Sequence, residues 1–277
     1  DKAYFILKDH MINLIGDIFS NSTNINILNS VANGLVHMTK YMKEADKGES
    51  VLKIVIQMAQ EDENEQKKEI AISLFGRLAP LVGSELISSY IVPQINFFSN
   101  DGSYRVRKEV ANQLKNICDK IDQQSFKKRL LPVYKNLSSD SSWYVKKVTA
   151  EILPDITKLC DTQTITKELL PIFKKFVQDE KNQVRNIAIE IFGEFISLIN
   201  KTSIDNFSEL LDFYVNTIMD LSTSKKENKT IIQKCAYNFP AVLMFFGAEA
   251  WPKLKPCFVK MANEKDEKIK IDRKSVV

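Results

Sequence analysis

A repeat of 39 residues is the feature that most constrains what this chain can fold into. Pro93, Pro132 and Pro171 stand at intervals of 39 residues. An aspartate follows each proline after eight residues, and a valine and a basic residue come five and six residues after the aspartate. Four kinds of residue therefore keep one spacing through three copies, which is typical of proteins built from stacked repeats.

The repeated aspartate and base are predicted to be structural. An aspartate at a turn can accept amide hydrogens at the start of the next helix, and a base can pair with the aspartate of its own or the adjacent unit. Counting 39 residues back from the first of the three copies adds one partly matching pair, with Ile54 at the proline position. The predicted ladder comprises Asp62, Lys68, Asp101, Arg107, Asp140, Lys146, Asp179 and Arg185.

Each unit has the apolar spacing of two helices. Apolar residues recur at intervals of three and four after each aspartate, and they do the same before it. In the second helices these are Val106, Val110, Leu114, Ile117 and Ile121, then Val145, Val148, Ile152, Ile156 and Leu159, then Val184, Ile187, Ile191, Phe195 and Leu198. The repeated proline lies inside each first helix, where it predicts a bend rather than a break.

The fold class that follows is all-α, an alpha-alpha superhelix of about seven helix pairs. One pair of helices buries too little apolar surface to offset its own ordering, so units must stack. We expect residues 1–277 to form one array, with the best-matching repeats over 87–198 and an irregular repeat with a long loop near 222–228. The sequence begins with Asp1, so we expect a fragment of a longer array.

The proline, aspartate and valine–arginine spacing resembles the HEAT repeat, the unit of the protein phosphatase 2A scaffold subunit. The strings 103–108, 131–147 and 234–242 also resemble the HEAT-repeat regulatory subunits of protein phosphatase 4, namely its regulatory subunit 1. This resemblance covers most of residues 51–270. Lys68 and Lys146 depart from the expected arginine, and lysine lacks the planar fork of a guanidinium, so a looser ladder is expected there.

The resemblance implies a non-catalytic scaffold or regulatory subunit that binds a serine/threonine phosphatase catalytic subunit and directs it to substrates. In the scaffold relative, partners dock on the turn between the two helices of a repeat. The corresponding candidates here are Tyr104, Arg105, Trp143, Tyr144 and Asn182. Tyr104 and Trp143 occupy equivalent positions, and an exposed aromatic there would either anchor a partner or cover the end of its own helix pair.

Catalysis, cofactors and metals find little support in the sequence. His10 and His37 are the two histidines, and no nucleophile is matched to either by spacing. No glycine-rich phosphate loop and no Cys/His cluster with metal-ligand spacing occurs. The four cysteines fall within apolar helical stretches, which favours reduced core residues. We predict that the chain is not an enzyme and holds no cofactor.

Two other functions stay open. A HEAT pattern specifies a shape and not a partner, so a structural adaptor in a large cytoskeletal or ciliary assembly is the alternative. Nucleic-acid binding through the basic segment 126–158 ranks below both, because the net charge of +4 is mild and charge runs are usually solvated helix faces. No apolar run is long enough to cross a membrane. We expect a cytoplasmic location, with nuclear or ciliary ones as alternatives.

Overall fold

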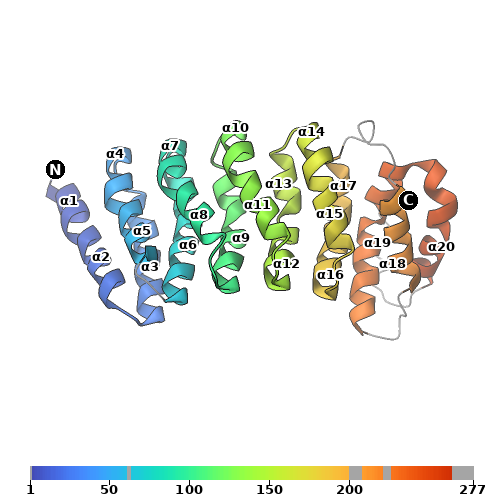
Figure 1. Cartoon of the computed structure of the whole chain (residues 1–277), viewed down its shortest axis with the longest axis horizontal. Helices are drawn as coiled ribbons and strands as arrows, with labels where there is room; N and C mark the ends of the chain where they lie inside the picture. The colour runs from blue at the N-terminus through green and yellow to red at the C-terminus, as the bar shows by residue number, and fades with distance from the viewer. Residues whose placement is uncertain (1, 61–63, 200–207, 221–225, 264–277) are drawn as a thin grey trace. The chain divides into compact units, whose positions relative to one another are not determined.

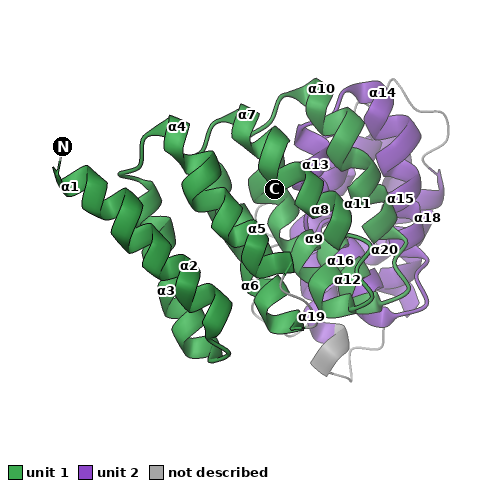
Figure 2. Cartoon of the chain, turned by 60° about the vertical axis from the view of Figure 1, so that its left-hand side comes forward, with its two compact units in different colours: residues 1–149 green, residues 150–277 purple. Residues whose placement is uncertain are grey.

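Helices and short turns make up the computed structural model, which describes residues 2–60, 64–199, 208–220 and 226–263. These ranges contain no strand. The chain divides into two compact units, residues 1–149 and 150–277, which Figure 2 colours separately. The predicted all-α class is confirmed, since each unit consists of helix pairs.

Unit 1 contains four second helices and the first helices that precede them. Each first helix is a short α-turn, a π-helical segment (marked η) and a longer α-helix. In chain order the elements are α1 (Lys2–Phe5), η1 (Ile6–Met11), α2 (Ile12–Asn21), α3 (Ile25–Thr39), α4 (Glu44–Asp46), η2 (Lys47–Leu52), α5 (Lys53–Gln60), α6 (Glu65–Leu78), the 3-10 turn η3 (Ala79–Leu81), α7 (Ser84–Leu86), η4 (Ile87–Ile91), α8 (Val92–Phe98), α9 (Tyr104–Cys118), α10 (Gln123–Ser125), η5 (Phe126–Leu130), α11 (Leu131–Ser138) and α12 (Trp143–Glu151).

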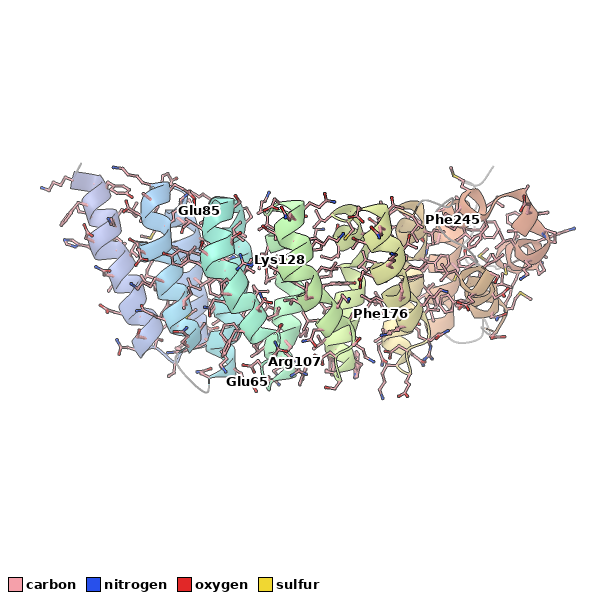
Figure 3. The ribbon with its side chains drawn as sticks, turned by 45° about the horizontal axis from the view of Figure 1, so that its top comes forward. Glu65, Glu85, Arg107, Lys128, Phe176 and Phe245 are labelled. Carbon is pink, nitrogen blue, oxygen red and sulfur yellow. The ribbon has the colours of Figure 1, made fainter. Side chains whose placement is uncertain are left out.

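The helices of unit 1 lie in two layers. First helices contact first helices, as α2 does with α5, while α6 packs between α3 and α9 in the second layer (Figure 1). In unit 1, the second helix of each pair therefore begins at the same edge. Figure 3 shows Glu65 and Arg107 at that edge, and Glu85 at the opposite one.

The core of each pair is made by the predicted apolar stripes. In the first helix, Ile91, Ile95 and Phe98 are fully buried, and in α9 so are Val106 and Leu114. These residues recur at three- and four-residue intervals, which places them on one face of each helix. Burial of each such side chain contributes about 1.5 to 3 kcal/mol, and this is the main force that joins the two layers.

Unit 2 continues the helix-pair pattern. Its elements are α13 (Leu153–Lys158), α14 (Thr162–Thr164), η6 (Ile165–Leu169), α15 (Leu170–Val177), α16 (Asn182–Glu190), α17 (Phe192–Ser197), α18 (Ser208–Asp220), α19 (Lys226–Phe246), the 3-10 turn η8 (Ala248–Ala250) and α20 (Trp251–Ala262). The described residues thus hold six complete helix pairs, and α20 begins a seventh, as expected. Residues 221–225, which hold most of the predicted long loop, lie outside the described residues.

The repeated prolines follow a π-helical segment. Pro93, Pro132 and Pro171 lie in the first two positions of α8, α11 and α15, directly after η4, η5 and η6. Proline lacks an amide hydrogen and crowds the carbonyl four residues earlier, and the wider π-helical turn accommodates both defects. The same segment precedes α5, where Ile54 replaces the proline, so the proline is accommodated by the turn and is not its cause.

Two predicted second helices are interrupted, where the spacing had indicated continuous ones. Helix α12 ends before Ile152 and α13 begins with Pro154 in its first turn, which removes an amide donor. The break between α16 and α17 at Ile191 has a different cause. Asn238 of α19 donates its amide Nδ2 to the carbonyl oxygens of Ile189 at 2.7 Å and Glu190 at 3.3 Å. A side chain from another helix thus takes over carbonyls that a continuous helix would use internally.

Glycine at position 193 makes this insertion possible. An alanine Cβ there would lie 2.6 Å from Asn238 Oδ1 and 3.3 Å from Ala241 Cβ. We predict that Gly193→Ala lowers the free energy of unfolding by about 1 to 3 kcal/mol, because the clash displaces a buried amide. Gly34→Ala in α3 is the matched control, since nothing lies within 4 Å of its Cβ. It should stabilise by up to about 1 kcal/mol. Urea unfolding followed by circular dichroism measures both, and equal effects would contradict the packing described.

Candidate protein-binding edge and groove

The turns that precede the second helices share one hydrogen-bond pattern. Oδ1 of Asp101 accepts from the amide of Ser103 at 2.8 Å, and Oδ1 of Asp140 accepts from the amide of Ser142 at 2.8 Å. Oδ1 of Asp179 bonds the amide of Lys181 in the same way at 2.9 Å. Each aspartate therefore binds the amide of the residue directly before the second helix. The repeated aspartate shapes the turn that starts each second helix.

Ion pairs join consecutive turns within unit 1. Lys68 Nζ lies 3.0 Å from Asp101 Oδ2. Arg107 binds the next aspartate through two bonds, from Nε to Asp140 Oδ2 at 2.7 Å and from Nη2 to Asp140 Oδ1 at 2.9 Å. Arg107 Nη1 also donates to the carbonyl oxygen of Asp101 at 2.8 Å, so one guanidinium holds its own turn and the following one. The hydrogen bonds to Asp140 raise the pKa of Arg107, which keeps the guanidinium charged.

The remaining ladder positions differ in their surroundings. Arg185 bonds within its own turn, to the carbonyl oxygen of Asp179 and the side-chain oxygen of Asn182. Lys146 lies half-buried in α12. Asp62 lies outside the described residues.

Three aromatic rings of the predicted partner-binding set lie together at this edge. Tyr104 stacks on Tyr144 with ring centroids 5.4 Å apart, and Tyr144 stacks on Trp143 at 3.7 Å. The side chains of Tyr104 and Tyr144 are 39% and 44% exposed, while Trp143 is half-buried. Arg105 is exposed and hydrogen-bonds to Tyr104. Asn182 is the first residue of α16 in unit 2.

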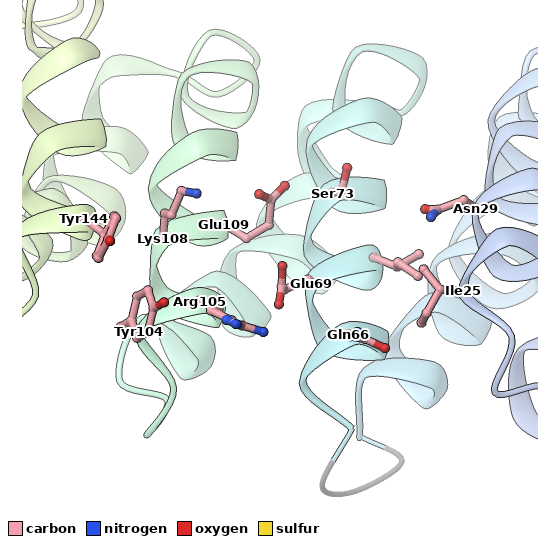
Figure 4. Close-up of a pocket in the computed structure, with 11 residues that line it drawn as sticks. Ile25, Asn29, Gln66, Glu69, Ser73, Tyr104, Arg105, Lys108, Glu109 and Tyr144 are labelled. Carbon is pink, nitrogen blue, oxygen red and sulfur yellow. The ribbon is translucent and has the colours of Figure 1, made fainter.

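A groove of about 550 Å³ extends from the tyrosines across the second helices of unit 1 (Figure 4). Tyr144 of α12 and Tyr104 of α9 stand at one end, and Asn29 of α3 stands at the other. The full lining is Ile25, Asn29, Gln66, Glu69, Ile70, Ser73, Tyr104, Arg105, Lys108, Glu109 and Tyr144. The groove is therefore open across four successive second helices and is lined by charged, amide and aromatic side chains.

Most of this lining was missed by the sequence reasoning, although a signal existed. Glu69 and Lys108 directly follow the ladder residues Lys68 and Arg107. Consecutive helical residues point about 100° apart, so Glu69 and Lys108 lie on the strip of helix surface next to the one that carries the ladder residues. A search for polar residues one position after the repeated base would have found them.

Four charged side chains line the groove, namely Glu69, Glu109, Arg105 and Lys108, and Glu69 is the one whose carboxylate is partly desolvated. Its carboxylate is half-buried, and burial followed by the charge of Glu109 raises its pKa above the ordinary value. Arg105 and Lys108 act in the opposite direction without reversing the rise. The groove thus holds a partly desolvated carboxylate beside another of the same sign.

Among the described residues, no group of three or more His, Cys, Asp or Glu side chains has an arrangement that would hold a metal ion. None of the helices in those ranges is long and apolar enough to span a bilayer.

The fold defined by these pairs is that of the armadillo and HEAT helical-repeat solenoids. A designed armadillo repeat protein, YIII(Dq)4CqI, is 17% identical and matches with a TM-score of 0.52, covering 81% of this chain and 98% of its own. Kap95p, which induces the switch loops of RanGDP to adopt the GTP-bound conformation, is 14% identical with a TM-score of 0.70. Kap121p is 15% identical with a TM-score of 0.66.

These two natural structures are much longer than this chain. The match covers 98% of this chain and 36% of Kap95p, and 99% of this chain and 28% of Kap121p. No family model matches the sequence, and no curated protein matches it. The particular class that the structure supports is therefore a repeat solenoid, a fold typical of protein-interaction scaffolds.

The ion pair between turns yields a stability prediction. Asp140→Ala removes both bonds to Arg107 and the acceptor for the Ser142 amide, and the side chains of Arg107 and Asp140 are only 14% and 7% exposed. We expect a loss of about 2 to 4 kcal/mol in the free energy of unfolding, because a nearly buried guanidinium loses its partner. The control is Asp212→Ala, which breaks the Lys253–Asp212 pair, whose side chains are 54% and 49% exposed. That change should cost less than about 1 kcal/mol.

Differential scanning calorimetry of the two variants provides the comparison. A similar small shift in melting temperature for both would show that the turns are not coupled through Arg107.

Proposed function

We propose that this chain is a non-catalytic scaffold subunit that binds a serine/threonine protein phosphatase catalytic subunit and directs it to substrates. The proposal rests on the edge of unit 1 where the second helices begin. Hydrogen bonds between Arg107 and Asp140 link consecutive turns there, and the exposed rings of Tyr104 and Tyr144 stack beside them. The resemblance of the turn pattern to phosphatase scaffold subunits supports the choice of partner. The proposed location is the cytoplasm.

A protein partner fits this edge better than a small molecule does. The groove is open across four helices, whereas small-molecule sites are typically enclosed and mostly apolar. Tyrosine provides a large contact area at a low cost in conformational entropy and is common among the residues that dominate binding energy. The exposed stack of two tyrosines is therefore suited to anchor a polypeptide.

We propose further that residues 1–277 form one array. The best-matching repeats, over 87–198, run through the boundary between the two compact units, which falls inside α12. The same proposal includes an irregular repeat with a long loop near 222–228, of which residues 226–228 belong to α19 in the structure, and further repeats in a longer protein.

A structural adaptor is the second candidate. It is supported by the repeat-solenoid fold itself, which specifies a shape and leaves the partner open. Size-exclusion chromatography of native extract distinguishes the two: the adaptor predicts a very large particle without phosphatase activity. Nucleic-acid binding ranks lower, since Lys158 of the basic segment is paired with Glu194 at 2.8 Å.

The tyrosine stack provides the test of partner binding. Tyr104→Ala combined with Tyr144→Ala should reduce capture of a phosphatase catalytic subunit from cell extract by at least about tenfold, because the anchoring area is lost. The measurement is quantitative mass spectrometry of proteins that co-purify with the tagged full chain.

The control is Tyr41→Ala, which removes a tyrosine that is 65% exposed and lies beyond the other end of α3. It should leave capture unchanged. Recovery of no phosphatase catalytic subunit with the unaltered chain would overturn the proposed partner, and equal capture by the double variant would overturn the proposed site.

A further inference from the structure

The first helix pair of unit 1 exposes more apolar surface than the other described pairs. Helices α2 and α3 pack against each other at the end of unit 1 that carries residue 2 (Figure 1). Among the described residues, 14 large apolar side chains are exposed, and six of them lie between Phe5 and Tyr41. Contiguous apolar patches on a protein surface mark places where another molecule packs.

The exposed apolar stripe of each helix points away from the neighbouring pair. Gly16 of α2 faces Ile54 of α5, since a Cβ on Gly16 would lie 3.5 Å from Ile54 Cδ1. Asn33 of α3 accepts a hydrogen bond from Arg77 of α6 at 2.8 Å. At about 100° per residue, the apolar residues of the two stripes lie about 120° to 160° away from these contacts. Together they form an end face that consists of Met11, Leu14, Ile18, Ile27, Val31 and Met38.

The second pair buries the positions that the end face exposes. Asn24 and Asn64 cap α3 and α6 through equivalent pairs of amides, so the second pair repeats the first at an offset of 40 residues. Met11, Leu14 and Ile27 are 44%, 53% and 47% exposed. The residues 40 positions after four members of the end face are at most 1% exposed, namely Val51, Met58, Ala71 and Leu78. The end face is therefore of the kind that this fold packs against two further helices.

The end face is suited to pack against its own copy. None of its six side chains carries a charge, so nothing on it repels a second copy, and a two-fold contact requires a surface that fits itself. A two-fold axis across the helices makes each helix antiparallel to its copy. Met11 then lies opposite Ile18 of the partner subunit, and Ile27 lies opposite Met38 of the partner subunit. Antiparallel helices packed in this way form a four-helix bundle.

The size of the end face indicates a weak dimer. Helix α3 has 15 residues and is about 22 Å long, and two packed helices are about 20 Å wide. A face of these dimensions covers about 450 Å² on each copy, or about 900 Å² for both. This area is at the lower limit of specific protein interfaces, where association is weak.

We propose that two copies of this chain associate through the end face and that their α2 and α3 helices form an antiparallel four-helix bundle. The inference goes beyond the proposed scaffold function, because it concerns association of the chain with itself. A further helix pair of the same array would also fit an apolar face, and the experiment below distinguishes the two.

The test is sedimentation velocity of the purified chain at concentrations from about 1 to about 200 μM. We expect the average sedimentation coefficient to rise from that of a monomer to that of a dimer, with a dissociation constant on the order of 10 μM. A chain that stays monomeric over this range would overturn the proposal and leave the end face to a further helix pair. Species larger than a dimer would also contradict it, because a two-fold contact closes on itself.

Substitutions locate the contact. Leu14→Glu and Ile27→Glu should each raise the dissociation constant at least about 100-fold, because the two-fold axis buries each introduced carboxylate twice. Val259→Glu is the matched control, since Val259 is 46% exposed and lies in α20 of unit 2. It should change the constant by less than about twofold. Undiminished dimerisation of both end-face variants, with circular dichroism showing intact helices, would overturn the proposal.

The dimer and the phosphatase partner can fail separately. A dimer that captures no phosphatase from extract would remove the proposed partner and keep the end-face contact. A monomeric chain that captures a phosphatase would remove the dimer alone.

Discussion

The two hydrogen bonds between Arg107 and Asp140 are the interaction on which the arrangement of unit 1 most depends. Apolar burial joins the two layers of helices, but burial is non-directional and tolerates sliding. A planar guanidinium that binds the next aspartate through Nε and Nη2 fixes one relative position of two successive turns. The same guanidinium bonds its own turn through the carbonyl oxygen of Asp101. The ion pair therefore fixes where the second helix of one pair begins relative to the second helix of the next pair.

This fixed arrangement explains how a repeat with a structural purpose also creates the surface that we propose binds a protein. The residue after each ladder base faces a neighbouring strip of its helix, so Glu69 and Lys108 enter the groove because Lys68 and Arg107 are held at the turns. Tyr104 and Tyr144 occupy the first turns of α9 and α12. A scaffold of this kind can change its partner by substituting those neighbouring positions while the ladder and the core stay the same.

The sequence predicted the helix pairs well because their cause is local. The spacing of Val106, Val110 and Leu114 determines one buried face, and the structure buries all three. The break at Ile191 could not be predicted in this way, because it depends on Asn238 from a helix that lies far along the chain. Pro154 is a sequence signal for the other break, but the apolar spacing continues on both sides of it and predicts one continuous helix.

The groove shows the same division between local and distant causes. Repeat comparison aligned Tyr104 with Trp143, whereas the ring that stacks on Tyr104 is that of Tyr144, one position later. Glu69 and Glu109 are 40 residues apart, so they are not equivalent within a 39-residue repeat and no alignment of repeats pairs them. Their proximity arises because α6 packs against α9. Positions within one repeat were therefore predictable, and contacts between unlike positions of adjacent repeats were not.

The central claim is that the edge where the second helices begin is the surface that binds a protein. Site-specific photocrosslinking measures this directly, with p-benzoylphenylalanine introduced at position 144 in one chain and at position 97 in another. Phe97 is 68% exposed but belongs to the first-helix layer. We predict that the partner crosslinks to position 144 and not to position 97. Crosslinking at position 97 alone would contradict the assignment of the binding surface.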